Sequence, residues 1–183
     1  MNKLPDPLRQ LDLSTLTDGC RHLSAAVVRV HAEAAAVCLS EIPHQAGVSL
    51  RVTGKHRVVY SMNWPPVTPM MRRSHGDQDE ATELGACGIA FHLIQDLEEK
   101  HVIERSRKGT GFDYWLGDDD DELPFQNKAR LEVSGIRHGR RANINKRVNQ
   151  KLGQTRRSDA MRIPAYVIVV EFGTPTAHIE VRS

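Results

Sequence analysis

Hydrophobic spacing in the first part of the chain predicts a helix followed by a hairpin. Over residues 22–41, hydrophobic residues recur at intervals of three and four, which is typical of an amphipathic helix, and Pro43 ends it. The β-prone runs 48–52 and 56–61 enclose a short polar turn and predict a β-hairpin. The segment before Gly19 is expected to be an arm or a brief helix. The expected buried side of the long helix is Leu23, Val27, Val30, Ala34 and Val37.

The rest of the chain alternates between helix and strand patterns. A long helix is expected over residues 80–100, with Leu84, Cys87, Phe91 and Ile94 as its buried side. Run 165–172 is the most hydrophobic of the chain and should be a central strand, whereas 177–181 is expected at an edge of the sheet. The other expected elements are strands 102–106, 112–116 and 130–136 and a basic helix 142–154.

This order of elements predicts the fold class and the domain organisation. We expect an α/β protein, with α+β as the alternative, in which helices flank a central mixed β-sheet. A chain of 183 residues has the length of one domain. Within it, residues 76–183 form the expected core, and residues 1–75 form an N-terminal helix and β-hairpin extension packed on that core.

Composition favours a soluble cytoplasmic protein. The chain is 39% hydrophobic and 26% charged, and no apolar run approaches the roughly 20 residues that span a membrane. Residues 1–10 do not resemble a secretory signal. Cys20, Cys38 and Cys87 are widely spaced, which argues against a zinc finger or a disulfide framework.

The charges are unevenly distributed although the net charge is only +2. Residues 118–122 are all acidic, and we expect them to form a solvated loop because the run lacks the spaced ligands of a calcium loop. Residues 134–157 contain no acid, so their basic side chains create a local positive field. These are Arg137, Arg140, Arg141, Lys146, Arg147, Lys151, Arg156 and Arg157.

Three acidic residues occupy positions where a carboxylate needs an explanation. Glu83 shares a helix side with Cys87, at the border of the core, so it needs a cation, a hydrogen-bonding partner or water. Asp113 stands between two aromatic residues at a strand end, although a turn aspartate bonded to local backbone is an alternative. Glu132 alternates with Leu131 and Val133 and should therefore point to the same face as Ser134.

These residues and the order of elements from about residue 80 to 181 resemble the PD-(D/E)XK nuclease superfamily, which has the restriction-endonuclease-like fold. In that family a helix provides a Glu, the second strand an Asp and the third strand the Glu of a Glu-x-Lys element. The resemblance implies a metal site of Glu83, Asp113, Glu132 and the carbonyl of Val133. Such hard oxygen ligands suit Mg²⁺ or Mn²⁺.

The family's lysine is replaced in this chain, because Ser134 stands at its position. A lysine there orients or deprotonates the attacking water. The expected catalytic group is therefore Asp113, Glu132, Ser134 and a cation supplied from elsewhere, with Lys146 as first choice and Arg130 and Lys108 as alternatives. The same replacement leaves open that the site is weak or inactive.

The expected partner is nucleic acid, with DNA favoured over RNA. A basic groove near the carboxylates would attract a phosphate backbone, although a basic helix is often only a solvated surface. A nuclease that cuts both strands would usually form a homodimer or bind a partner subunit. The candidate nucleic-acid-binding residues are Arg137, Arg140, Arg141, Lys146, Lys151 and Arg156.

Two alternatives remain beside the metal-dependent nuclease. The chain could be an inactive nuclease-fold protein that binds nucleic acid or supports an assembly. It could also be a small α+β module that binds another protein through its first helix and hairpin. Metal-dependent cleavage separates the first function from the other two.

Overall fold

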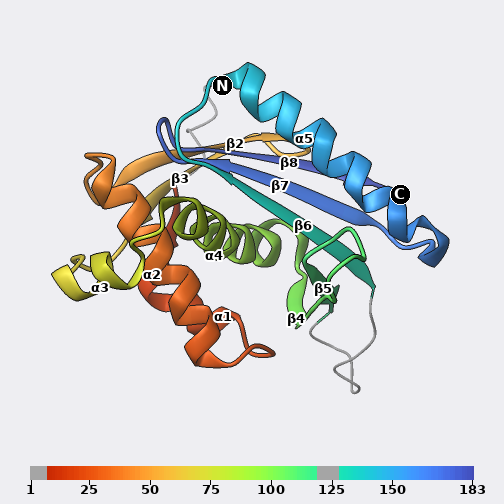
Figure 1. Cartoon of the computed structure of the whole chain (residues 1–183), viewed down its shortest axis with the longest axis horizontal. Helices are drawn as coiled ribbons and strands as arrows, with labels where there is room; N and C mark the ends of the chain where they lie inside the picture. Colours follow the sequence, from red (N-terminus) through yellow and green to blue (C-terminus); the bar gives the residue numbers. More distant parts are fainter. Residues whose placement is uncertain (1–7, 119–127) are drawn as a thin grey trace, which may run out of the picture.

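One mixed sheet of eight strands organises residues 8–118 and 128–183, which are the residues that the computed structural model describes (Figure 1). The strand order is β1-β3-β2-β8-β7-β6-β5-β4. With helices on both faces of this sheet, the predicted α/β class is confirmed. The strands are β1 (Arg9–Asp12), β2 (Val48–Gly54), β3 (Val58–Asn63), β4 (His101–Arg105), β5 (Tyr114–Gly117), β6 (Ala129–Ile136), β7 (Ala165–Glu171) and β8 (Thr176–Arg182).

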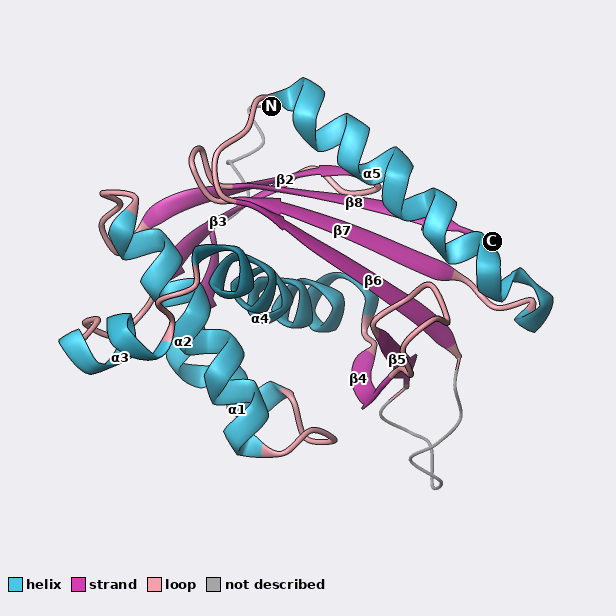
Figure 2. Ribbon diagram, viewed as in Figure 1, coloured by secondary structure: helices cyan, strands magenta, loops and turns pink. Residues whose placement is uncertain are grey.

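The helices form layers on the two faces of the sheet (Figure 2). On one face, α2 (Ala25–Glu41) and α4 (Gln78–Glu98) build the main hydrophobic core, and α5 (Arg141–Thr155) covers the other face. Strand β7 serves both layers, because Ile168 packs toward the main core and Val167 toward α5. The shorter helices are η1 (Leu13–Thr15), α1 (Leu16–Gly19), α3 (Pro69–Ser74) and η2 (Arg156–Met161).

The second half of the chain has the predicted order of elements. Helix α4 is followed by β4, β5 and β6, then by α5 and the two last strands. Strands β4, β5 and β6 are antiparallel neighbours, whereas β6 and β7 run parallel. The parallel connection brings α5 across the sheet, over β6 and β7.

Strand β8 lies inside the sheet, so its predicted edge position is wrong. It pairs antiparallel with β7 and parallel with β2. The predicted hairpin forms, but β2 continues the sheet beyond β8, and the sheet therefore runs without a break from β1 to β4. Strand partners that are distant in the chain cannot be identified from the local pattern of β8.

Two expectations for the N-terminal part are only partly right. The segment before Gly19 contains β1, which pairs parallel with β3, in addition to short helices. On α2, Ala34 and Val37 are buried as expected. Val27 and Val30 are instead 45% and 44% exposed, and the neighbouring Val28 and His31 are buried. The close contact between α2 and α4 sets the buried side of α2, and periodicity alone does not reveal that contact. Within the described ranges, no helix is long and apolar enough to cross a bilayer.

Glycines allow α2 and α4 to approach closely, which leads to a stability prediction. A Cβ atom on Gly85 would lie 2.9 Å from the backbone of Ala35, and neither helix can yield without disturbing the core. We expect Gly85→Val to lower the free energy of unfolding by about 2 kcal/mol, measured by urea denaturation. Gly153→Val is the control, because a Cβ atom added there would meet no atom within 4 Å outside its own helix. Equal stability of the two variants would contradict the prediction.

Candidate active site

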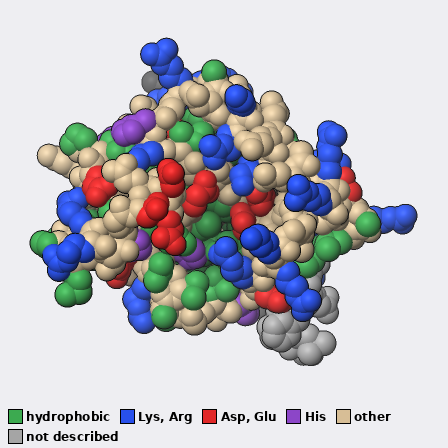
Figure 3. Space-filling view, viewed as in Figure 1, with side chains coloured by type: hydrophobic (Ala, Val, Ile, Leu, Met, Phe, Trp, Pro, Cys, Tyr) green, Lys and Arg blue, Asp and Glu red, His purple; other side chains and the backbone are tan. Residues whose placement is uncertain are grey.

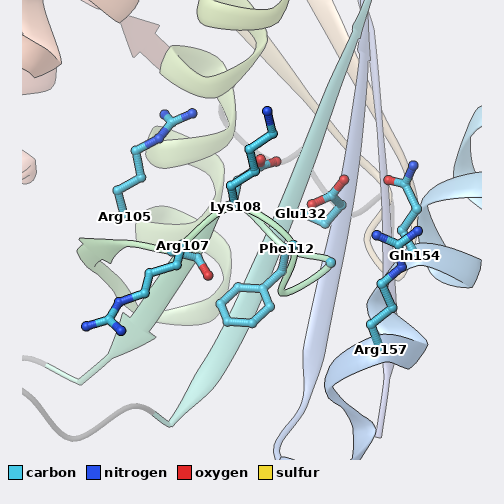
Figure 4. A pocket seen from close by; sticks show the side chains of 11 residues that line it. Arg105, Arg107, Lys108, Phe112, Glu132, Gln154 and Arg157 are labelled. Carbon is cyan, nitrogen blue, oxygen red and sulfur yellow. The ribbon is translucent and has the colours of Figure 1, made fainter.

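A cleft opens between the loop that joins β4 to β5 and the C-terminal end of α5. Its volume is about 380 Å³. Figure 4 shows Arg105, Arg107 and Lys108 on one side of it and Gln154 and Arg157 on the other, with Glu132 between them. The loop is held against α5 at Gly111, where φ is +85° and an added Cβ would lie 2.2 Å from the carbonyl oxygen of Gln154.

Two carboxylates, Asp113 and Glu132, lie next to each other in this cleft. Glu132 comes from β6 and is 4% exposed, and Asp113 directly precedes β5. The backbone N–H of Val133 donates to Asp113 Oδ2 at 2.9 Å, and the N–H of Asp113 donates to the carbonyl of Leu131 at 2.8 Å. Asp113 is therefore fixed by a neighbouring strand, and the alternative of a turn aspartate bonded to local backbone is wrong.

The surroundings of Glu132 favour its protonated form. Burial, then the charge of Asp113 and a hydrogen bond with that carboxyl, raise the pKa of Glu132 to about 7. The ammonium group of Lys151 acts in the opposite direction, because its Nζ lies 2.7 Å from Glu132 Oε1. Asp113 thus lies close enough to Glu132 to disfavour the charged form of the Glu132 carboxyl.

This raised pKa predicts a pH-dependent stability. Glu132 binds its proton more tightly in the folded state than at its ordinary pKa of 4.5. Its contribution to stability is therefore fully present below about pH 4.5 and is lost as the pH rises through about 7. We expect the metal-free protein to lose on the order of 1–3 kcal/mol relative to Glu132→Gln over this window, measured by urea denaturation. A constant difference between the two proteins across the window would contradict the assignment.

The cations beside the carboxylates come from α5, at positions 147 and 151. Lys151 contacts Glu132, and Arg147 donates to Ser134 Oγ at 2.6 Å. Lys146, the first choice from sequence, is exposed on the same helix. The helical period separates neighbouring residues by about 100°, so only one of positions 146 and 147 can face the sheet. The sequence places Lys151 on α5 but gives no sign that this lysine reaches β6.

Of the other two cation candidates, Arg130 is buried away from the carboxylates' cleft lining and Lys108 is exposed at the cleft. Arg130 is 2% exposed, and its guanidinium donates to the carbonyls of Thr155 and Ile163 and to the hydroxyl of Ser158. It therefore fixes the segment after α5. Lys108 is exposed and lies at the mouth of the cleft that contains both carboxylates (Figure 4).

Glu83 turns toward β6, where it bonds to the two residues Ser134 and Gly135. Ser134 Oγ donates to its Oε1 at 3.2 Å, and the N–H of Gly135 donates to its Oε2 at 3.0 Å. Arg147 lies 3.6 Å from the same carboxylate, whose side chain is half exposed. Glu83 thus has hydrogen-bonding partners on β6 and a cation, Arg147, beside it. Both were among the partners that its position at the border of the core requires.

The oxygen atoms around Asp113 and Glu132 can be compared with the ligands that a divalent cation needs. Among the residues that the structure describes, no three His, Cys, Asp or Glu side chains are grouped to hold a metal ion, so Glu83 does not complete a triad. Mg²⁺ needs only one or two carboxylates, because it retains several waters. The N–H of Val133 donates a hydrogen bond to Asp113. The carbonyl of Val133 points to the same edge of β6 as this N–H, because both groups of one residue face the same side of a strand. Asp113, Glu132 and this carbonyl are hard oxygen donors, the type of ligand that Mg²⁺ and Mn²⁺ prefer.

The predicted nucleic-acid-binding residues have different surroundings. Arg137 pairs with Glu41 on α2, and Lys151 contacts Glu132. The exposed ones, on α5 or directly next to its ends, are Arg140, Arg141, Lys146 and Arg156. The basic side chains at the cleft are instead Arg105, Arg107, Lys108 and Arg157. Three of these come from the end of β4 and the loop that follows it, where the sequence Arg-Ser-Arg-Lys is the local signal for a basic cleft.

Charge on the molecular surface agrees with this arrangement. On the face drawn in Figure 3, acidic side chains gather near the middle, and Lys and Arg side chains lie beside them. At the start of the acidic run, Asp118 pairs with Lys100 at 3.0 Å and with Lys128 at 2.9 Å. Residues 119–122 lie outside the described residues, and their expected role as a solvated loop stays a prediction.

The geometry therefore defines a candidate site from its own side chains: two adjacent carboxylates, a lysine bonded to one of them, and arginines and lysines at the mouth of the cleft. Comparisons with protein-family models, with curated proteins and with solved structures find no significant match for this chain.

Proposed function

We propose that this protein is a metal-dependent nuclease that hydrolyses phosphodiester bonds, with DNA as the favoured substrate. The observation that carries the proposal is the Asp113–Glu132 pair in a cleft whose mouth is basic. Adjacent carboxylates repel each other unless a proton or a cation lies between them. Surrounding arginines and lysines indicate that the ligand is anionic.

The order of elements supports the same proposal. Helix α4, strands β4 to β6, helix α5 and strand β7 follow the order that the resemblance to the PD-(D/E)XK superfamily implies. Asp113 lies at the start of the second strand of this set and Glu132 on the third, as the resemblance also implies. Glu83 is on the preceding helix, but its hydrogen bonds to β6 give it a structural role.

The chain's own residues suggest how the reaction would proceed. Asp113, Glu132 and the Val133 carbonyl would hold Mg²⁺ or Mn²⁺, which would neutralise charge on the phosphate and lower the pKa of a water. Lys151 is in place to orient that water, since it already donates to Glu132. Lys151 would thereby take the role of the family's lysine, although it comes from α5 and not from β6. Ser134 is bonded to Arg147 and Glu83 and shapes β6 beside the site.

A cleavage assay tests this function. Purified protein should convert supercoiled plasmid or a labelled oligonucleotide to shorter products with Mn²⁺ or Mg²⁺, and EDTA should stop the reaction. DNA and RNA oligonucleotides of the same sequence separate the two substrate classes. The absence of cleavage with either cation on every substrate would refute the nuclease.

A non-catalytic nucleic-acid-binding protein is the second candidate. The observation in its favour is Ser134, which occupies the usual lysine position and is engaged by Arg147. Such a protein would bind DNA in a salt-sensitive manner without cutting it. Retained binding together with no cleavage would therefore select this candidate over the nuclease. A module that only binds another protein should show neither activity.

A further inference from the structure

A chain of hydrogen bonds runs from the hydrophobic core to the cleft. His31 of α2 is 2% exposed, and its Nδ1 lies 3.1 Å from the carbonyl oxygen of Leu84. Its Nε2 lies 3.1 Å from the hydroxyl of Tyr114, which is 1% exposed. The same hydroxyl lies 2.8 Å from Nη1 of Arg105, a residue that lines the cleft.

The chemistry of these groups fixes the direction of every hydrogen bond. A carbonyl only accepts, so Nδ1 of His31 carries the hydrogen that reaches Leu84. Burial lowers the pKa of His31 to about 4, so the ring is neutral and its Nε2 accepts. Tyr114 must then donate to His31, which leaves its oxygen to accept from Arg105. The donors and acceptors in this chain of hydrogen bonds can therefore be assigned in only one way.

Aromatic contacts hold the same groups in place. The ring of Tyr114 meets Phe91 edge to face, with centroids 5.0 Å apart, and Phe91 meets His31 at 5.1 Å. The guanidinium carbon of Arg105 lies 5.3 Å from the centre of the Tyr114 ring. Arg105 is itself exposed, so these contacts hold an otherwise mobile side chain beside the cleft.

We propose that Arg105 is a preorganised contact for a substrate phosphate next to the Asp113–Glu132 pair, and that the buried residues Tyr114 and His31 are positioning residues for it. This inference rests on the proposed function and specifies one of its binding residues. Tyr114 directly follows Asp113 in the chain, so the same strand end sets the positions of the carboxylate and of the arginine. Fixing Arg105 before binding reduces the entropy that binding would otherwise cost.

A double-mutant cycle on oligonucleotide affinity tests the inference. Arg105→Gln, Tyr114→Phe and the double variant are compared with the wild type by fluorescence anisotropy in EDTA, where cleavage does not interfere. We expect Arg105→Gln to weaken binding about fivefold and to reduce the salt slope by about one. Tyr114→Phe should weaken binding about threefold alone and have no further effect once Arg105 is replaced.

The matched control is Tyr60→Phe. Tyr60 is also buried and donates to Asp96, but it lies outside the cleft. Its variant should lose stability without losing affinity. Equal effects of Tyr114→Phe with and without Arg105, or an effect of Tyr60→Phe as large as that of Tyr114→Phe, would overturn the positioning role. An unchanged salt slope in Arg105→Gln would overturn the phosphate contact.

The outcomes separate this inference from the proposed function. Cleavage by the wild type together with an additive cycle rejects the positioning role and keeps the nuclease. A non-additive cycle without cleavage keeps the phosphate contact and rejects the nuclease. Wild-type protein that neither binds nor cleaves rejects both. Nitrogen NMR of the His31 ring tests the chain of hydrogen bonds in the protein without a ligand. A His31 tautomer with the hydrogen on Nε2 would overturn the assigned hydrogen bonds.

Discussion

Asp113→Asn and Glu132→Gln are each expected to reduce Mn²⁺-dependent cleavage by about a thousandfold, which corresponds to roughly 4 kcal/mol of transition-state stabilisation. Both substitutions keep the size of the side chain and remove the negative charge that would hold the cation. Glu132 is buried and bonded to Lys151, so its replacement affects the charge at the centre of the site. Initial rates on a labelled oligonucleotide give the measurement.

The control for these variants is Glu180→Gln. Glu180 lies on β8, and its carboxylate is 45% exposed and pairs only weakly with His178, at 3.4 Å. Its variant should cleave like the wild type, and all three variants should retain cooperative thermal unfolding. Full activity of Asp113→Asn or Glu132→Gln would show that these carboxylates do not hold the catalytic ion.

Lys151→Met is expected to reduce cleavage by about a hundredfold, because this lysine is in place to orient the attacking water. The aliphatic part of the side chain is retained, so packing between α5 and the sheet should change little. The effect should appear in kcat with a nearly unchanged KM, since the proposed role of Lys151 lies in the chemical step. Steady-state kinetics on an oligonucleotide series provides both constants.

Lys146→Met is the matched control on the same helix. Lys146 is exposed, whereas Lys151 contacts Glu132. A loss of activity in Lys146→Met that equals the loss in Lys151→Met would show that α5 contributes only general positive charge. A normal rate in Lys151→Met would leave the water without its proposed partner and favour another cation of the cleft, such as Lys108.

The elements of the fold could be predicted well because their patterns are local. Helix α4 and strands β6 and β7 have hydrophobic spacing that tertiary contacts reinforce, and each lies within a few residues of its predicted range. Strand β8 shows the limit of this reasoning. Its neighbour β2 is more than 120 residues away in the chain, and a parallel pairing over that separation leaves no mark in either strand.

The candidate site could be predicted in part. Alternation along β6 correctly placed Glu132 on the face away from Leu131, and the strand-end position singled out Asp113. The partner of Glu132 was not predictable, because a change of one residue on α5 moves a side chain by about 100° around the helix. Arg105 was missed because its role depends on His31, which lies 74 positions earlier in the chain.

Because β8 lies between β2 and β7, the N-terminal hairpin cannot be removed from the protein without exposing a strand edge. If residues 1–75 were removed, the backbone N–H and C=O groups of β8 that now bond to β2 would face solvent along a newly opened strand edge. That edge could recruit strands from other molecules and drive aggregation. We therefore expect the first hairpin to limit the self-association of residues 76–183, because it covers this strand edge.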